Sequence, residues 1–68
     1  MNNQEKTDMR FIELWDYEEA GQYYQVNVDH IVWFKGIEVN DIERTVVKLS
    51  NGEVIQVSQT VKEIYNAL

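Results

Sequence analysis

The pattern of hydrophobic and polar positions predicts three strands in the first half of the chain. Aromatic and β-branched side chains, which favour strands, cluster in three runs: residues 9–15, 23–28 and 31–37. In the second run, alternation places Tyr24, Val26 and Val28 on one face. The third run opens with four consecutive apolar residues, which is typical of a strand buried on both faces, by the core or by a partner.

Polar segments separate these runs. Residues 16–21 read as a turn in which Gly21 is free to adopt a positive φ. Asp29 and His30 mark a short corner, and residues 38–43 read as a polar connection. Residues 1–8 contain no apolar residue after the initiator and are expected to form a flexible tail, which leaves 9–68 as a single domain.

The second half of the chain predicts a hairpin over residues 44–57, because Asn51-Gly52 separates two β-rich runs. A two-residue loop would place Ile55 and Val57 on the face opposite Val47. A three-residue loop with Gly52 in a bulge pairs Val47 with Ile55, and Thr45 with Val57, so that all the apolar residues share one face. We therefore expect the bulged loop.

A short helix is expected to close the chain. Ser58 or Thr60 can cap it, and Thr60 with Glu63 has the spacing of a capping box. One apolar stripe follows at helical spacing: Val61, Ile64, Tyr65 and Leu68. The fold class is therefore α+β: a small antiparallel sheet of four or five strands, a meander with the bulged hairpin, and one C-terminal helix that must pack on the sheet or on another subunit.

Composition adds a constraint on stability. A 68-residue chain buries a small core, and small domains usually add disulfides, a metal or a partner subunit. This chain has no Cys and one His, which excludes disulfides and thiolate metal sites, and no cofactor or metal is expected. Self-association is the remaining route, so a homo-oligomer is predicted.

The charge balance limits the partners. Twelve acidic against six basic residues give a net charge of −6, which disfavours direct binding to nucleic acid or to an anionic membrane. The sequence has no apolar run near 18 residues and no secretory signal, so a cytoplasmic protein is expected. A basic protein surface suits the charge best.

Two sets of residues are candidates for contact with a partner. Aromatic side chains exceed what a small core needs, and Trp33 and Phe34 cannot both lie on one face of a strand, so one should face outward. The expected interface residues are Trp15, Tyr24, Trp33, Phe34 and Tyr65. An acidic patch would form if the loops meet at one end of the sheet: Asp16, Glu18, Glu19, Glu38, Asp41 and Glu43. Core packing and ordinary solubility charge are the plainer interpretations of these two sets.

Catalytic and metal-binding interpretations are weaker. Asp29 beside His30 could orient a base for Ser50 or Ser58, but neighbours on an extended chain point to opposite sides, so a surface histidine is favoured. Residues 16–27 share the first, third and sixth positions of a calcium loop but lack its final Glu, which favours a solvated acidic turn. No catalytic residue is therefore predicted.

Three segments carry a resemblance to a known family: NVDHIVWF, TVVKLSNGEVIQV and SQTVKEIYNAL. Over residues 9–68 the chain resembles the small FlbD family of flagellar and swarming-motility proteins. The resemblance implies an early strand, an Asn-Gly hairpin and a closing helix, with a role in motility regulation and no catalytic residues.

We therefore expect a non-enzymatic, acidic protein-binding or regulatory module that forms homo-oligomers. One alternative is a phage-type or anti-defence inhibitor that acts as an acidic mimic of nucleic acid. Another is a protein that binds small ligands at its subunit interfaces.

Overall fold

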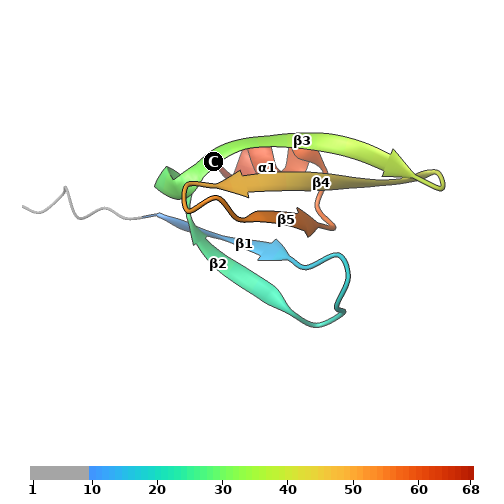
Figure 1. Ribbon diagram of the computed structural model, residues 1–68, viewed down its shortest axis with the longest axis horizontal. Helices are drawn as coiled ribbons and strands as arrows, with labels where there is room; N and C mark the ends of the chain where they lie inside the picture. The colour runs from blue at the N-terminus through green and yellow to red at the C-terminus, as the bar shows by residue number, and fades with distance from the viewer. Residues whose placement is uncertain (1–9) are drawn as a thin grey trace, which may run out of the picture.

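The computed structural model describes residues 10–68, so the expected tail and Met9 lie outside the described residues. Five strands and one helix follow in order: β1 (Phe11–Trp15), β2 (Tyr23–Asn27), β3 (Ile31–Val39), β4 (Ile42–Leu49), β5 (Val54–Val57) and α1 (Val61–Ala67). A single 3₁₀ turn, Val28–His30, joins β2 to β3 at the expected corner. The α+β class with antiparallel strands and one short C-terminal helix is thereby confirmed (Figure 1).

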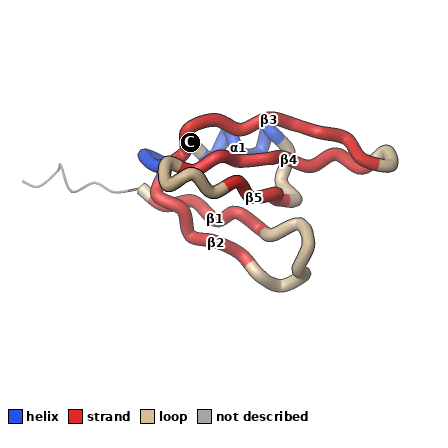
Figure 2. The backbone as a smooth tube through the Cα atoms, viewed as in Figure 1, coloured by secondary structure: helices blue, strands red, loops and turns tan. Residues whose placement is uncertain are grey.

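The strands form two antiparallel sheets, β1-β2 and β3-β4-β5, so the expectation of one sheet was wrong (Figure 2). The two sheets are joined by backbone hydrogen bonds where β1 ends beside β5. There Tyr17 N–H donates to the Gln56 carbonyl and Ser58 N–H donates to the Trp15 carbonyl, both at 2.9 Å. This contact is a single bridge, between Asp16 and Val57, and not a full ladder.

The hairpin of β3 and β4 corrects the expected polar connection at residues 38–43. Val39 pairs with Ile42, which leaves a two-residue turn of Asn40 and Asp41 with φ of 53° and 65°. Asn and Asp tolerate this left-handed backbone better than other non-glycine residues, and a two-residue hairpin turn of type I′ requires it at both positions. Glu38 and Glu43 are therefore strand residues that lie directly opposite each other.

The hairpin of β4 and β5 has the expected strand pairs. Thr45 lies opposite Val57, and Val47 lies opposite Ile55. Leu49 N–H donates to the Glu53 carbonyl at 2.8 Å, and Gly52 has a φ of 93°. The bulge in this loop stays a prediction.

The core lies between the two sheets and α1. Its buried residues come from all three: Ile12, Leu14, Val26, Val47, Ile55, Val57 and Ile64. Thr60 caps α1 in the expected box, with Glu63 N–H donating to its hydroxyl at 3.1 Å. Of the expected apolar stripe only Ile64 is buried, whereas Tyr65 is 71% exposed, because a two-turn helix can bury only a narrow line of side chains.

Gln59 and Thr45 fix the start of α1 against both sheets. The buried Thr45 hydroxyl donates to the Gln59 carbonyl at 2.6 Å. The Gln59 side chain in turn bonds the β1 backbone, since its Oε1 accepts from Trp15 N–H at 2.9 Å and its Nε2 donates to the Glu13 carbonyl at 2.6 Å. The free edge of β1 is therefore partly covered, and β2 and β3 are left as the outer strands of the two sheets.

Candidate functional site

A β-bulge turns one side of β3 toward solvent. The register with β4 shifts between Ile31 and Trp33, so that Val32 is an extra residue in β3. Ile31 and Phe34 consequently pack against the core, while Val32 and Trp33 are exposed. Within the chain, β3 is therefore buried on one face only, and burial of the other face by a partner stays a prediction. Of the two neighbouring aromatic residues, Trp33 is the one that faces outward.

Trp33 belongs to what we call the outer face, which is the side of the β3-β4-β5 sheet turned away from the core. Strand pairing arranges this face in four rows: Trp33–Lys48–Val54, Lys35–Val46–Gln56, Ile37–Arg44 and Val39–Ile42. Trp33 is 41% exposed and Val54 is 54% exposed, and Val39 and Ile42 are exposed as well. Val46, in the second row, is buried, so the exposed apolar residues of the outer face lie toward its two ends and are spread over three strands.

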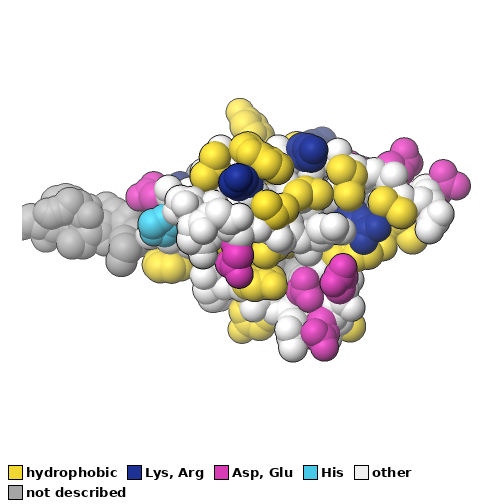
Figure 3. All heavy atoms as spheres, in the orientation of Figure 1, with side chains coloured by type: hydrophobic (Ala, Val, Ile, Leu, Met, Phe, Trp, Pro, Cys, Tyr) yellow, Lys and Arg dark blue, Asp and Glu magenta, His cyan; other side chains and the backbone are white. Residues whose placement is uncertain are grey.

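The charges on the outer face are all positive. Lys35, Arg44 and Lys48 lie on it, which are three of the six basic residues of the chain, and none of its ten residues is Asp or Glu. Lys35 Nζ lies 5.6 Å from the centre of the Trp33 ring, and the Arg44 guanidinium carbon lies 3.9 Å from the centre of the Tyr17 ring. Figure 3 shows basic atoms scattered among hydrophobic ones over these strands.

The six residues of the expected acidic patch form two groups and not one. The first lies in the connection of β1 to β2 and the second at the tip of the β3-β4 hairpin, at the same end of the molecule in Figure 1. In Figure 3, hydrophobic and basic atoms separate the two acidic groups. Within the first group, Glu19 N–H donates to Asp16 Oδ2 at 3.0 Å, so Asp16 stabilises its own turn.

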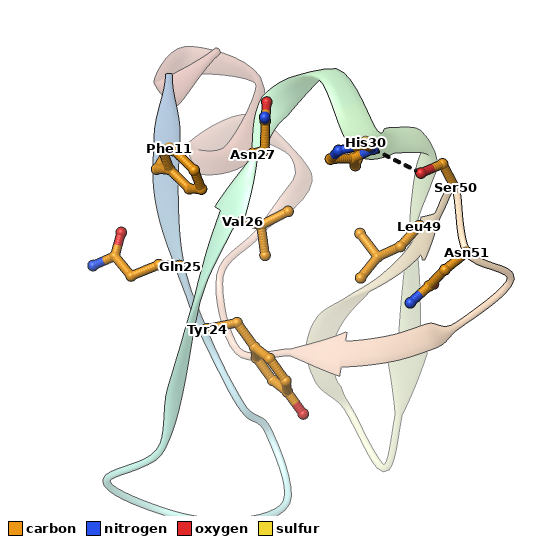
Figure 4. Close-up of a pocket in the computed structure, with 9 residues that line it drawn as sticks. All are labelled: Phe11, Tyr24, Gln25, Val26, Asn27, His30, Leu49, Ser50 and Asn51. Carbon is orange, nitrogen blue, oxygen red and sulfur yellow. Dashed lines mark hydrogen bonds between the residues drawn. The ribbon is translucent and has the colours of Figure 1, made fainter. Parts of the chain in front are cut away.

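A cleft of about 440 Å³ opens between β2 and the loop that joins β4 to β5. Figure 4 shows Val26 on β2 and Leu49 on the opposite wall pointing toward each other across it, with Tyr24 at one end. None of its lining residues is Asp, Glu, Lys or Arg: Phe11, Tyr24, Gln25, Val26, Asn27, His30, Leu49, Ser50 and Asn51. The cleft therefore suits an uncharged group.

His30 and Ser50 meet at the rim of this cleft. Their side chains are joined by a hydrogen bond of 2.8 Å between His30 Nδ1 and Ser50 Oγ, and Ser50 N–H donates to the His30 carbonyl at 2.8 Å. Sequence reasoning named both residues, and the structure brings them together (Figure 4). Both residues are exposed, and the paired bonds close the corner where β3 begins, so the contact has a structural role.

The five expected interface residues are dispersed. Trp15 stacks on Tyr23 at 4.7 Å between ring centres, Tyr24 lines the cleft, and Trp33 lies on the outer face. Phe34 packs against the core, and Tyr65 projects from α1. Sequence reasoning missed that Lys35, Arg44 and Lys48 share the outer face with Trp33.

Two further properties concern the described residues alone. Within residues 10–68, no three His, Cys, Asp or Glu side chains are grouped so that they could hold a metal ion. Over the same range, the helix is neither long nor apolar enough to cross a bilayer.

No protein-family model, curated protein or solved structure matches this chain. The resemblance to the FlbD family therefore stays a prediction, and any function must be argued from the residues themselves.

Proposed function

We propose that this protein is a non-enzymatic protein-binding module that docks its outer face on an acidic, partly apolar surface of a partner protein. The observation that carries the proposal is the composition of that face. It combines exposed apolar residues with three cations and no carboxylate, on a chain whose net charge is −6.

The apolar part of the outer face supplies the driving force. Contiguous exposed apolar patches on small domains are typical of protein contact surfaces, and Trp is among the residues that contribute most to binding energy. Trp33 is held by its bulge and by Lys35, so binding would order little that is not already ordered.

The cations favour an acidic partner. Lys35 and Lys48 lie on either side of Trp33, one along its own strand and one across the sheet, where their aliphatic stems can cover apolar surface while the ammonium groups reach a carboxylate. Complementary charge of this kind raises the rate of association and selects against basic partners. A single-stranded nucleic acid is less suited, because the face offers one exposed ring and is otherwise aliphatic.

A photocrosslinking amino acid at position 33 tests the proposal in the cells that make the protein. We expect an adduct with another protein, attached within an acidic segment, which is lost when Lys35→Glu and Lys48→Glu are added. The matched control places the same aromatic crosslinker at Tyr65, the most exposed aromatic residue, which lies off the outer face.

Three results would contradict the proposal. They are equal adducts from positions 33 and 65, an adduct indifferent to the two Lys→Glu changes, or an adduct made only of two copies of this chain. The setting we propose is motility regulation, and it rests on the FlbD-like resemblance alone. Mimicry of nucleic acid has less support, because the acidic residues lie in two separate groups.

A further inference from the structure

We infer that the partner binds the outer face with a single amphipathic α-helix of about four turns, which lies along the strands and carries acidic residues between two apolar ends. The inference rests on the proposed function, since it names the element by which an acidic partner docks. It adds the shape, the length and the charge order of that element.

The exposed apolar residues of the outer face lie at its two ends. One end, which we call the Trp33 end, has Trp33 and Val54 in the first row. The other, which we call the hairpin end, has Val39 and Ile42 in the last row. All four side chains are exposed, whereas Val46 between the two ends is buried. A partner must therefore contact both ends to cover these four residues.

The distance between the two ends sets the length of the docking element. The register of β3 with β4 is regular from Trp33 to Val39, which are six residues apart on one strand. With a rise of about 3.3 Å per residue, the two ends are separated by about 20 Å. An α-helix covers this distance in about four turns, or roughly 14 residues, which is an ordinary length for a helix in a globular protein.

A helix suits this surface better than an extended segment because of its backbone. The N–H and C=O groups of β4 bond β3 on one side and β5 on the other, so the face above this strand presents side chains alone. An extended segment laid across it would leave its own N–H and C=O groups against apolar side chains without partners. A helix bonds these groups internally and can lie flat on the face.

The cations between the two ends set the charge order of the helix. Lys35 lies in the second row and Arg44 in the third, while Lys48 lies beside Trp33 in the first. Rows on one face are about 6.7 Å apart, which is close to the helical pitch of about 5.4 Å. Acidic side chains on the inner turns of the helix therefore meet Lys35 and Arg44, and apolar side chains on its first and last turns meet the two ends.

A second copy of this chain does not supply such a helix. In the described part of the chain the α-helix is α1, which has seven residues and already buries Ile64 in the core. Its length is about 10 Å, which is half of the separation between the two ends. The docking helix is therefore expected to belong to a different protein.

Crosslinkers at the two ends of the outer face measure the shape of the bound element. The same photocrosslinking amino acid replaces Trp33 or Ile42 in the cells that make the protein, and the attachment sites are mapped by mass spectrometry. We expect both positions to attach to one protein, at residues roughly 11–15 apart in its sequence with acidic residues between them, since three to four turns separate such side chains on one face of a helix.

A spacing outside this range overturns the inference. About six residues would indicate an extended segment, and a spacing of many turns would indicate two separate elements of the partner. An adduct from position 33 with none from position 42 also overturns it. These three results leave the proposed function standing, because position 33 still reports a partner. If position 33 gives no adduct with another protein, the proposed function fails, and this inference fails with it.

A synthetic peptide that covers the crosslinked segment provides a second test. Its helical circular-dichroism signal should rise when it is mixed with the protein, and Pro at a middle position on its solvent side should weaken binding at least about tenfold. The matched control has Pro at the first helical position, where a helix tolerates it, and should bind like the original peptide. Equal binding of the two Pro peptides would contradict a helix.

Discussion

The two faces of the β3-β4-β5 sheet are built from the same strands but have opposite surroundings. On the inner face, Val47 and Val57 are fully buried under the second sheet and α1. On the outer face, Trp33 and Val54 keep much of their surface exposed. Both faces are rich in apolar residues, so apolar content alone does not tell a core from a contact surface.

Polar groups distinguish the two faces more clearly. The inner face has one buried polar residue, Thr45, and its hydroxyl is hydrogen-bonded at 2.6 Å. On the outer face, Arg44 Nε and Gln56 Oε1 are buried and, within the described residues, have no hydrogen-bond partner. The chain itself already covers both atoms, so a partner docked on the outer face would not reach them, and this face is less completely hydrogen-bonded than the core.

The largest effect should come from Val47→Ala. This change removes two methyl groups from a fully buried site and leaves a cavity, so the free energy of unfolding should fall by about 2–3 kcal/mol. Val54→Ala, the matched change on the outer face, should cost less than about 0.5 kcal/mol. Urea denaturation of both variants measures the difference. Equal losses would show that the outer face is as well packed as the core.

Thr45→Val should cost about 1–2 kcal/mol, although the two side chains have nearly the same shape. The substitution removes the donor and leaves the Gln59 carbonyl without that bond. Urea denaturation again measures the change in the free energy of unfolding. Thr60→Val cannot serve as the control, because Thr60 caps α1. An unchanged free energy of unfolding would mean that the stability of the inner face does not depend on the hydrogen bond between Thr45 and the Gln59 carbonyl.

Gln56→Met should be neutral or stabilise the protein by up to about 1 kcal/mol. It removes a buried acceptor that has no partner and keeps a side chain of similar length. The sign is opposite to that of Thr45→Val, although both positions lie in the same sheet. A thermal melt that shows Gln56→Met to be clearly less stable would indicate that Oε1 is in fact hydrogen-bonded.

The sequence was sufficient for elements whose signals are local. The Asn-Gly run located the β4-β5 hairpin, the phase of Val47 against Ile55 gave its register, and Thr60 with Glu63 gave the helix start. Each depends on residues that lie close together in the chain. The way the two sheets meet depends instead on the bridge between Asp16 and Val57, which lie far apart in the sequence, so no local pattern encodes it.

The outer face was missed because one turn was missed. With residues 38–43 read as a connection, Lys35 and Lys48 have no fixed relation. Once Asn40 and Asp41 are taken as the turn, Val39 pairs with Ile42, and counting back along both strands places Trp33 opposite Lys48. The signal for this turn was the Asn-Asp pair between Val39 and Ile42, because Asn and Asp tolerate the positive φ angles that the turn requires.

The smallest effect concerns the tip of the hairpin, where the inner face extends beyond the core. Glu38 and Glu43 lie directly opposite each other, and Glu43 Oε2 lies 3.9 Å from a Cβ built on Gly36, which places it on the inner side. Like charges in such a pair are destabilising, so Glu43→Gln should raise the free energy of unfolding by about 0.2–1 kcal/mol at low salt. The gain should shrink near 1 M salt, where the screening length is about 3 Å. Glu18→Gln removes the same charge from an exposed loop and serves as the control; if both variants gain equally, net charge rather than this pair is responsible.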